Sequence, residues 1–450
     1  MIYTNQFKKG RTVEKFFKIS ERGSSVGTEL RAGLTTFLAM AYIIAVNPSL
    51  LAAAGIPIEA AVTSTCVAAG IMTILMGVFS NRPLACASGM GINAVVAFSL
   101  TAAADGDWRV AMAVIFLEGI VILGLVLCGL REAIMDAIPM ALRHAIAAGL
   151  GIFIALLGMI NGHLVVDNPA TLIGFGSVYD PVFQVAALSV ITTFVLHIFN
   201  VKGSILWGII VATIAGIPLG VTMIPEAIIS MPDFSTFGAP FQTAADGSGM
   251  ALIKVFLSPT LLVFVFSIML SDFFDTMGTA VAVAKQGDFL DNEGNVEDIR
   301  PILVVDSCAA AFGGFCGASS CTTFLESASG AADGGRTGLT SITAGVIFLI
   351  CAFFSPLVSI ISAPATCGAL VMVGCLMMNV VADIDFNDPL QGIPAFMTII
   401  GIPLTYSISI GIGLGFITYV IIACAMGKFK EIKPLMWFVV LAFLVSFFIA

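Results

Sequence analysis

The nine residues SDFFDTMGT, Ser271 to Thr279, place two carboxylates inside an apolar run that extends from Pro259 to Ala284. On a helix, Asp272, Asp275 and Thr279 follow one another at intervals of three and four residues, so their side chains share one face. A carboxylate at the centre of a lipid bilayer costs at least about 2.5–3.5 kcal/mol and normally faces a cavity rather than lipid. The stretch therefore indicates either a polar binding site inside a transporter or two carboxylates that cap or bridge neighbouring helices.

The composition is that of a polytopic helical membrane protein. Of the 450 residues, 59% are hydrophobic and only 10% are charged, whereas soluble domains carry about 25% charged residues. The net charge of −9 comes from scattered acids without a basic patch, which argues against a nucleic-acid partner. The ten cysteines lie singly in apolar runs without metal-ligand spacing. We therefore expect no metal and no cofactor, and we interpret the cysteines as small hydrophobic side chains.

Apolar segments predict fourteen membrane spans in two groups of seven, separated by a long loop without cations. The first group is expected at residues 30–54, 60–80, 84–104, 109–130, 139–161, 183–200 and 203–220. The second group is expected at residues 259–285, 301–318, 319–333, 338–361, 365–382, 390–406 and 408–427. A last apolar piece, Pro434 to Ala450, is either one more span or a segment that lies in the membrane interface.

The distribution of cations supports an even number of spans before the C-terminal tail. Residues 1–31 carry seven Lys and Arg, which predicts a cytoplasmic N-terminus in a multi-pass protein of the plasma membrane. With this topology, all but two of the 19 Lys and Arg fall on the cytoplasmic side, the exceptions being Arg109 and Lys254. Removing one span from the middle would invert the later loops and destroy this bias.

Two predicted spans are too short and too rich in small polar residues to be ordinary helices. They are LACASGMGINAVVAF, Leu84 to Phe98, and GASSCTTFLESASGAADGG, Gly317 to Gly335. Each is the third span of its half, and matched defects of this kind indicate an inverted-repeat transporter with a site near the membrane midplane. Irregular backbone at that depth is tolerated only beside a cavity or inside the protein.

Several features in these spans have both a structural and a functional interpretation. GMGINA at 89–94 matches a dinucleotide-binding pattern but lacks the strand–helix–strand context, so we interpret it as a glycine-permitted break or as close helix packing. Glu326 is either a helix cap or an acceptor for a ligand N–H group. Glu118 is either a proton relay or part of an interhelical hydrogen bond, and Asp306 is expected near the cytoplasmic surface.

Four stretches together resemble the purine (AzgA-like) branch of the nucleobase:cation symporter-2, or nucleobase–ascorbate transporter, superfamily. They are LRAGLTTFLAMAYIIAVNP at 30–48, GMGINA at 89–94, DFFDTMGT at 272–279 and TTFLESASGAADGGRTGLT at 322–340. The resemblance implies an all-α, uracil-permease-like fold of fourteen spans in two inverted repeats of seven, with short strands in the broken third and tenth spans. It also implies a core domain that moves against a gate domain.

The implied boundaries follow the two repeats. They are a cytoplasmic N-terminus at 1–29, core at 30–130 (spans 1–4), gate at 131–220 (spans 5–7), an extracellular loop at 221–258, core at 259–361 (spans 8–11), gate at 362–427 (spans 12–14) and a C-terminal tail with an apolar segment at 428–450.

The resemblance further implies that the substrate lies between the two broken spans. Carried over by motif, the expected substrate-binding residues are Asp272, Asp275, Thr279, Asn93, Met90, Gly91, Phe324, Leu325 and Glu326. Asp275 and Glu326 are the expected proton-coupling residues. Thr279 stands where related uracil carriers often have histidine. Cys86-Ala87-Ser88 replaces the more usual proline-containing entry to GMG. This second substitution leaves the strand geometry and the choice of purine open.

The function implied is secondary active transport, not enzymatic catalysis. We expect import of purine nucleobases, hypoxanthine or guanine and as a further candidate adenine, by proton symport in the lipid bilayer, with a homodimer as one compatible assembly. A carrier of another small solute or of an anion on the same fold is the alternative, although three site carboxylates would repel an anion. An intramembrane aspartyl protease is disfavoured because the closest intramembrane aspartates share one helix and no GxGD element is present.

Overall fold

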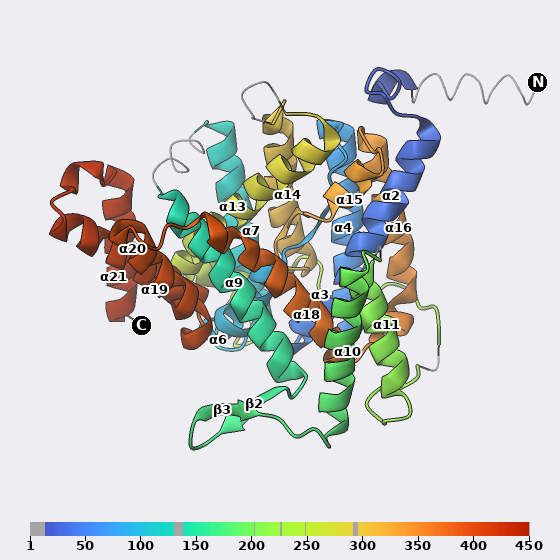
Figure 1. The fold of residues 1–450 in the computed structure, drawn as a ribbon, viewed down its shortest axis with the longest axis horizontal. Coiled ribbons are helices and arrows are strands. Elements are labelled where there is room, and N and C mark those ends of the chain that lie inside the picture. Colours follow the sequence, from blue (N-terminus) through green and yellow to red (C-terminus); the bar gives the residue numbers. More distant parts are fainter. Residues whose placement is uncertain are drawn as a thin grey trace, which may run out of the picture.

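The computed structural model of the protein describes residues 14–129, 138–201, 203–225, 227–247, 249–290 and 296–449. Residues 1–13, which include three of the predicted cytoplasmic cations, lie outside these ranges. The described chain is built almost entirely of helices, with two pairs of short strands. The N-terminal segment lies at one end of the helix bundle, and the β2–β3 hairpin lies at the opposite end (Figure 1).

The first half of the chain contains an interrupted first helix and an interrupted third segment. Its elements are α2 (Val26–Met40), α3 (Ile43–Ala53), α4 (Ile58–Ser80), β1 (Cys86–Ser88), α5 (Met90–Ala94), the π-helical η1 (Val95–Leu100), α6 (Thr101–Ala103), α7 (Trp108–Leu127), α9 (Met140–Asn161), β2 (Val165–Asn168), β3 (Leu172–Phe175), α10 (Pro181–Ile198) and α11 (Ser204–Gly216).

The second half repeats this order of long and interrupted segments. Its elements are η2 (Ala239–Phe241), α12 (Ala251–Leu257), α13 (Pro259–Gly287), α14 (Ile299–Cys316), β4 (Cys321–Thr323), α15 (Ser327–Ala332), α16 (Gly338–Cys351), η3 (Ala352–Phe354), α17 (Ser355–Ser359), η4 (Ala363–Thr366), α18 (Cys367–Met377), η5 (Met378–Asp383), α19 (Pro389–Thr405), α20 (Ile408–Ala425), η6 (Phe429–Glu431) and α21 (Pro434–Ile449).

The helices agree with the predicted membrane spans. Among the described residues, nine helical stretches are long and apolar enough to cross a bilayer. The five remaining predicted spans coincide with shorter or interrupted elements, namely the segments around β1 and β4 and the helices α11, α19 and α20. A polytopic helical membrane protein is therefore confirmed, and the count of fourteen spans stays a prediction.

The two predicted irregular spans meet at the centre of the molecule. Strands β1 and β4 pair antiparallel, with Cys86 opposite Thr323 and Ser88 opposite Cys321. The backbone pairing continues past the strand ends, because Gly89 N donates to Ser320 O at 2.8 Å and Phe324 N donates to Ala85 O at 2.9 Å. These short strands satisfy their backbone groups across the two halves of the chain, which an irregular segment at membrane depth requires.

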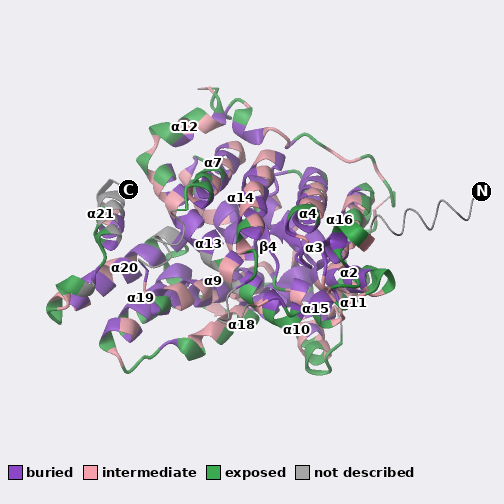
Figure 2. Cartoon of the chain, turned by 90° about the horizontal axis from the view of Figure 1, so that it is seen from above, coloured by how far each residue is buried: buried purple, intermediate pink, exposed green. Residues whose placement is uncertain are grey.

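The buried core surrounds this strand pair. Seen from above, β4, α3, α4, α13 and α14 are mostly buried, whereas α12 and the far ends of the outer helices carry the exposed positions (Figure 2). Helix α14 packs against α4 and α7, and α16 packs against α2 and α4. Helix α18 packs against α9 and α10, and α19 packs against α9 and α20. The assignment of these two groups to core and gate stays a prediction.

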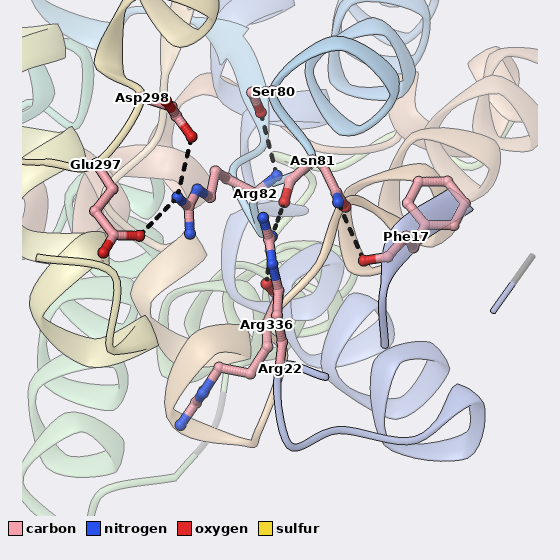
Figure 3. A network of polar contacts seen from close by, with 8 residues as sticks. All are labelled: Phe17, Arg22, Ser80, Asn81, Arg82, Glu297, Asp298 and Arg336. Carbon is pink, nitrogen blue, oxygen red and sulfur yellow. Dashed lines mark hydrogen bonds and ion pairs between the residues drawn. The ribbon is translucent and has the colours of Figure 1, made fainter. Parts of the chain in front are cut away.

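A polar network fixes the N-terminal segment to three other parts of the chain (Figure 3). Arg22 donates to the carbonyl oxygens of Asn81, at the end of α4, and of Arg336, before α16. Asn81 in turn donates to Phe17 O at 3.1 Å. Arg82 pairs with Glu297 at 3.1 Å. Burial, and then the neighbouring Arg82 guanidinium, lower the pKa of Arg22 below its ordinary value. These contacts hold the ends of α4, α14 and α16 together.

Candidate functional site

A cavity of about 640 Å³ lies beside the paired strands. Its walls come from both halves of the chain: the break between α2 and α3, the first turn of α5, the middle of α13, the residues after β4, and α9 and α18. The volume falls within the roughly 300–1,000 Å³ of small-molecule sites. The walls are mainly apolar, with a few polar groups, which is the arrangement that orients a small, partly polar ligand.

Two acidic side chains line this cavity. Asp275, on α13, is exposed at the cavity wall, with Ser271 one turn before it and Thr279 one turn after it. Glu326, immediately before α15, lines the cavity from the other half of the interrupted tenth segment. An ionised carboxylate only accepts hydrogen bonds, so both groups suit a ligand that presents N–H donors.

Glu326 is held in place by Tyr42. The Tyr42 hydroxyl donates a hydrogen bond to Glu326 Oε1 at 2.5 Å. Tyr42 lies where the first helix is interrupted, between the end of α2 at Met40 and the start of α3 at Ile43. Sequence reasoning missed Tyr42 as a site residue. Its position inside an apolar run is compatible with ordinary helix packing, and only the contact with the distant Glu326 shows its role.

Apolar and backbone groups complete the walls. Phe324 and Leu325 follow β4, and Met90 and Gly91 form the first turn of α5. The first N–H groups of a helix have no intrahelical acceptor, so the first turn of α5 offers donors to the cavity side of the third segment. Phe324 is 5% exposed, which leaves one part of its ring at the cavity wall.

Three comparisons with known proteins agree with this geometry. A family model described as a permease family matches residues 27–414. The chain belongs to this permease family. The permease is 37% identical over 440 residues to the guanine/hypoxanthine permease PbuO of Bacillus subtilis, covering 96% of this chain and 99% of that protein. It is 34% identical over 444 residues to the adenine permease AdeP of Escherichia coli K12, covering 99% of this chain and 98% of that protein.

A solved structure confirms the fold. The transmembrane domain of the bicarbonate transporter BicA of a cyanobacterium superposes with a TM-score of 0.62 at 15% sequence identity, covering 85% of this chain and 96% of that chain. The predicted uracil-permease-like fold with two inverted repeats is therefore correct. The family model and the nucleobase permeases among the relatives separately confirm the predicted membership of the nucleobase–ascorbate transporter superfamily. Family membership makes the permease a transporter and not an enzyme.

Seven of the predicted site residues line the cavity of the permease, and two do not. Those at the cavity are Asp275, Thr279, Glu326, Phe324, Leu325, Met90 and Gly91. Asp272 and Asn93 are absent from the cavity walls, and both are fully buried. Asn93 Nδ2 instead donates to Ser88 O at 3.3 Å, at the start of α5. Successive residues on a helix turn by about 100°, so Asp272 and Asp275 are separated by about 60° around α13, enough for the two carboxylates to point to different neighbours.

Asp306 is buried against strand β4, so the expectation of a position near the cytoplasmic surface is wrong. Its side chain is 2% exposed. Its carboxylate accepts hydrogen bonds from Thr276 Oγ1 at 2.6 Å, from Thr323 N at 2.9 Å and from Thr322 Oγ1 at 3.2 Å. Asp306 therefore anchors the strand that carries Thr323 and Phe324 to the cavity.

The described residues contain no group of three or more His, Cys, Asp or Glu side chains that could hold a metal ion. The cavity lining also includes Arg143 and His144, near the start of α9. Arg143 donates from Nε to Ile138 O at 2.9 Å. The cavity lining thus combines two acids, Asp275 and Glu326, with one guanidinium, that of Arg143.

Proposed function

We propose that the permease is a secondary active transporter that imports purine nucleobases by proton symport. The observation that carries this proposal is that Asp275 on α13 and Glu326 before α15 line one cavity together with the first turn of α5. A neutral purine has ring N–H donors and ring nitrogen acceptors. The two carboxylates can accept from its N–H groups, and the first N–H groups of α5 can donate to its ring nitrogens.

The remaining walls suit a flat aromatic ligand. Phe324 presents an aromatic ring, and stacked aromatic pairs contribute about 0.5–1.5 kcal/mol beyond the area they bury. Leu325 and Met90 supply apolar surface. Relatives named as guanine/hypoxanthine and adenine permeases support hypoxanthine or guanine as the substrate, with adenine as the further candidate.

The cavity does not favour the alternative of an anion carrier. Among the described lining residues, Asp275 and Glu326 are the acids and Arg143 is the lysine- or arginine-type cation. Two carboxyl groups and one guanidinium line the cavity, so an anion would meet more acidic than cationic groups. We therefore consider a neutral base a better candidate for the transported solute than an anion.

Movement of the core against the gate would give access to the cavity from alternate sides. The proposed core consists of residues 30–130 and 259–361, and the proposed gate of residues 131–220 and 362–427. The cavity is lined by residues of both, which supports a site at their boundary. The proposed setting is the plasma membrane, with the N-terminus in the cytoplasm. A homodimer is the proposed assembly.

The test is uptake of labelled hypoxanthine into proteoliposomes that contain the purified permease. With a pH gradient that is acidic outside, we expect saturable accumulation, which a proton-conducting ionophore abolishes. Unlabelled guanine, hypoxanthine and adenine should compete in the order of their affinities, whereas uracil and bicarbonate should not. Uptake that is no faster than in vesicles without protein, for every base, would exclude purine transport.

A further inference from the structure

A second group of acids lies outside the cavity of the permease. Glu118 on α7, Asp272 on α13 and Asp306 on α14 are all buried, at 0%, 0% and 2% exposure. They come close enough to interact electrostatically with one another. None of the three lines the cavity. Thr323 lies between the two regions, because it lines the cavity and its backbone N–H donates to Asp306.

The three carboxyl groups differ in their hydrogen bonds. Asp306 accepts from two hydroxyls and one backbone N–H, as expected of a carboxylate that is kept as an anion. By contrast, none of the four carboxyl oxygens of Glu118 and Asp272 has a hydrogen-bond partner among the described residues. The Thr322 hydroxyl lies next to Asp272 but donates to Asp306.

No described cation forms an ion pair with Glu118 or Asp272. The ion pairs formed by described residues involve neither Glu118 nor Asp272. The other titratable groups that face the pair are Asp275 and the thiols of Cys86 and Cys321, none of which is cationic. Burying an ionised carboxylate without a partner is very costly, so such a group takes up a proton instead.

A buried hydroxyl accompanies Glu118 at this place. The Ser320 hydroxyl lies beside Glu118, is completely buried and, apart from Glu118, has no hydrogen-bond partner among the described residues. A hydroxyl can donate to a carboxylate or accept from a protonated carboxyl group. Ser320 can therefore serve Glu118 in both protonation states.

The helices that carry Glu118 and Asp306 pack tightly against each other. Helices α7 and α14 touch directly next to Glu118: a Cβ atom on Gly119 would lie 2.7 Å from Ala311 Cα, and one on Gly314 would lie 2.6 Å from Phe116 N. Such close helix packing is compatible with a ligand that needs no coordination shell. A proton needs none.

We propose that Glu118 and Asp272 form a proton-binding site of the permease, separate from the substrate cavity, and that this pair carries the coupling proton. The proposal rests on the proposed function for its coupling role. This differs from the expectation drawn from the sequence, in which Asp275 or Glu326 carries the coupling proton. The buried pair communicates with the cavity through Asp306, which holds Thr323 on β4, and through α13, where Asp272 and Asp275 lie about one turn apart.

The first experiment compares accumulation with exchange in proteoliposomes. The amide of Glu118→Gln imitates a protonated carboxyl group that cannot release its proton. We expect this variant to lose accumulation of hypoxanthine driven by a pH gradient, so that the internal concentration stops at the external one, while exchange of labelled for unlabelled hypoxanthine continues. Asp272→Asn should also lose accumulation. Glu118→Asp, which keeps a carboxyl group, should retain part of it, and the exposed Glu59→Gln should match the parent protein.

Three results of this experiment would overturn the proposal. One is accumulation by Glu118→Gln in proportion to the imposed pH gradient. Another is accumulation by both amide variants combined with its loss in Asp275→Asn, which would place the proton in the cavity. The third is accumulation driven by a sodium gradient at equal pH and lost in Glu118→Gln, which would make the pair a sodium site.

A second experiment does not depend on purine transport. Infrared difference spectra of the purified permease, recorded as the pH is changed, should contain a carboxyl C=O band from a protonated buried acid. We expect this band to lose intensity in Glu118→Gln and in Asp272→Asn, and to persist in Glu59→Gln. A spectrum that is the same in all four proteins would overturn the proton site. A normal result here without purine uptake would contradict only the proposed function.

Discussion

Tyr42 donates a hydrogen bond to Glu326 at 2.5 Å, although 284 positions separate the two residues in the sequence. The bond joins the interruption of the first helix to the residue before α15. It fixes one Glu326 oxygen and leaves the other available to a ligand. A change in the position of the first helix therefore changes the position of an acid at the cavity wall.

Replacing Tyr42 by Phe should weaken hypoxanthine binding about tenfold or more without preventing membrane insertion. The substitution removes a hydrogen bond to a charged group, which contributes about 1.5–3 kcal/mol, and it keeps the ring. The measurement is equilibrium binding of labelled hypoxanthine to the purified protein. Tyr179→Phe is the matched control, because Tyr179 is 88% exposed. Equal affinity of Tyr42→Phe and the parent protein would show that Glu326 is positioned by other contacts.

Glu326→Gln should abolish or severely weaken purine binding in a protein that still inserts into the membrane. The amide replaces a charge-assisted acceptor with a weaker one and adds an N–H₂ group that faces the ligand's own donor. The loss should be at least about 1.5–3 kcal/mol. Binding and membrane content are measured on the same samples, with Glu59→Gln as control. Normal uptake affinity in Glu326→Gln would remove Glu326 from the site.

Phe324→Leu should lower the affinity for purines by about two- to tenfold, because it replaces a stacking ring by an aliphatic chain of similar hydrophobicity. Affinity is measured by competition with labelled hypoxanthine. Phe353→Leu is the control, since Phe353 is 45% exposed and not part of the cavity. If Phe324→Leu binds purines as the parent does, the ring contributes to strand packing and not to stacking on the substrate.

A variant without cysteines should still transport. All ten cysteines are unpaired, and none of them lines the cavity. Replacement by Ala keeps the small apolar volume that the buried cysteines fill. Uptake is measured after confirming insertion and folding. Complete loss of uptake in a folded variant would contradict the interpretation of the cysteines as inert side chains.

The contact of Asp180 with His163 predicts a loss of stability in acid. Asp180 accepts a hydrogen bond from His163 Nδ1 at 2.7 Å and one from Val182 N at 3.0 Å, at the start of α10. The hydrogen bond from His163, and then that from Val182, lower the pKa of Asp180 below its ordinary value. The folded-state pKa thus lies below the unfolded one, so the stabilisation is complete above the unfolded pKa and is lost as the pH falls through the folded pKa.

The corresponding measurement is the melting temperature of detergent-solubilised protein as a function of pH. Between about pH 6 and pH 3, the parent should lose more stability than Asp180→Asn, which lacks the titrating group. Asp167→Asn on the exposed hairpin is the control. Parallel pH profiles for the parent and Asp180→Asn would show that this contact does not contribute to stability.

Local sequence patterns were sufficient for the class of protein and for the position of the site along the chain. The small polar residues of 84–98 and 317–335 predicted two broken spans, and these are the segments in which β1 and β4 form. The acids Asp275 and Glu326 could be selected because a carboxylate in an apolar segment is rare and costly. These inferences use hydropathy and composition, which are properties of neighbouring residues.

The sequence by itself therefore determined that this is a polytopic helical transporter, where its helices are interrupted and which acids lie in apolar segments. Only the tertiary structure decided which way each acid faces. It places Asp275 at the cavity and Asp272 beside Glu118, brings Asp306 under β4, and brings Tyr42 to Glu326. The physical reason is that these relationships depend on small rotations of a helix and on contacts between distant segments, and neither leaves a periodic signal in the sequence of one segment.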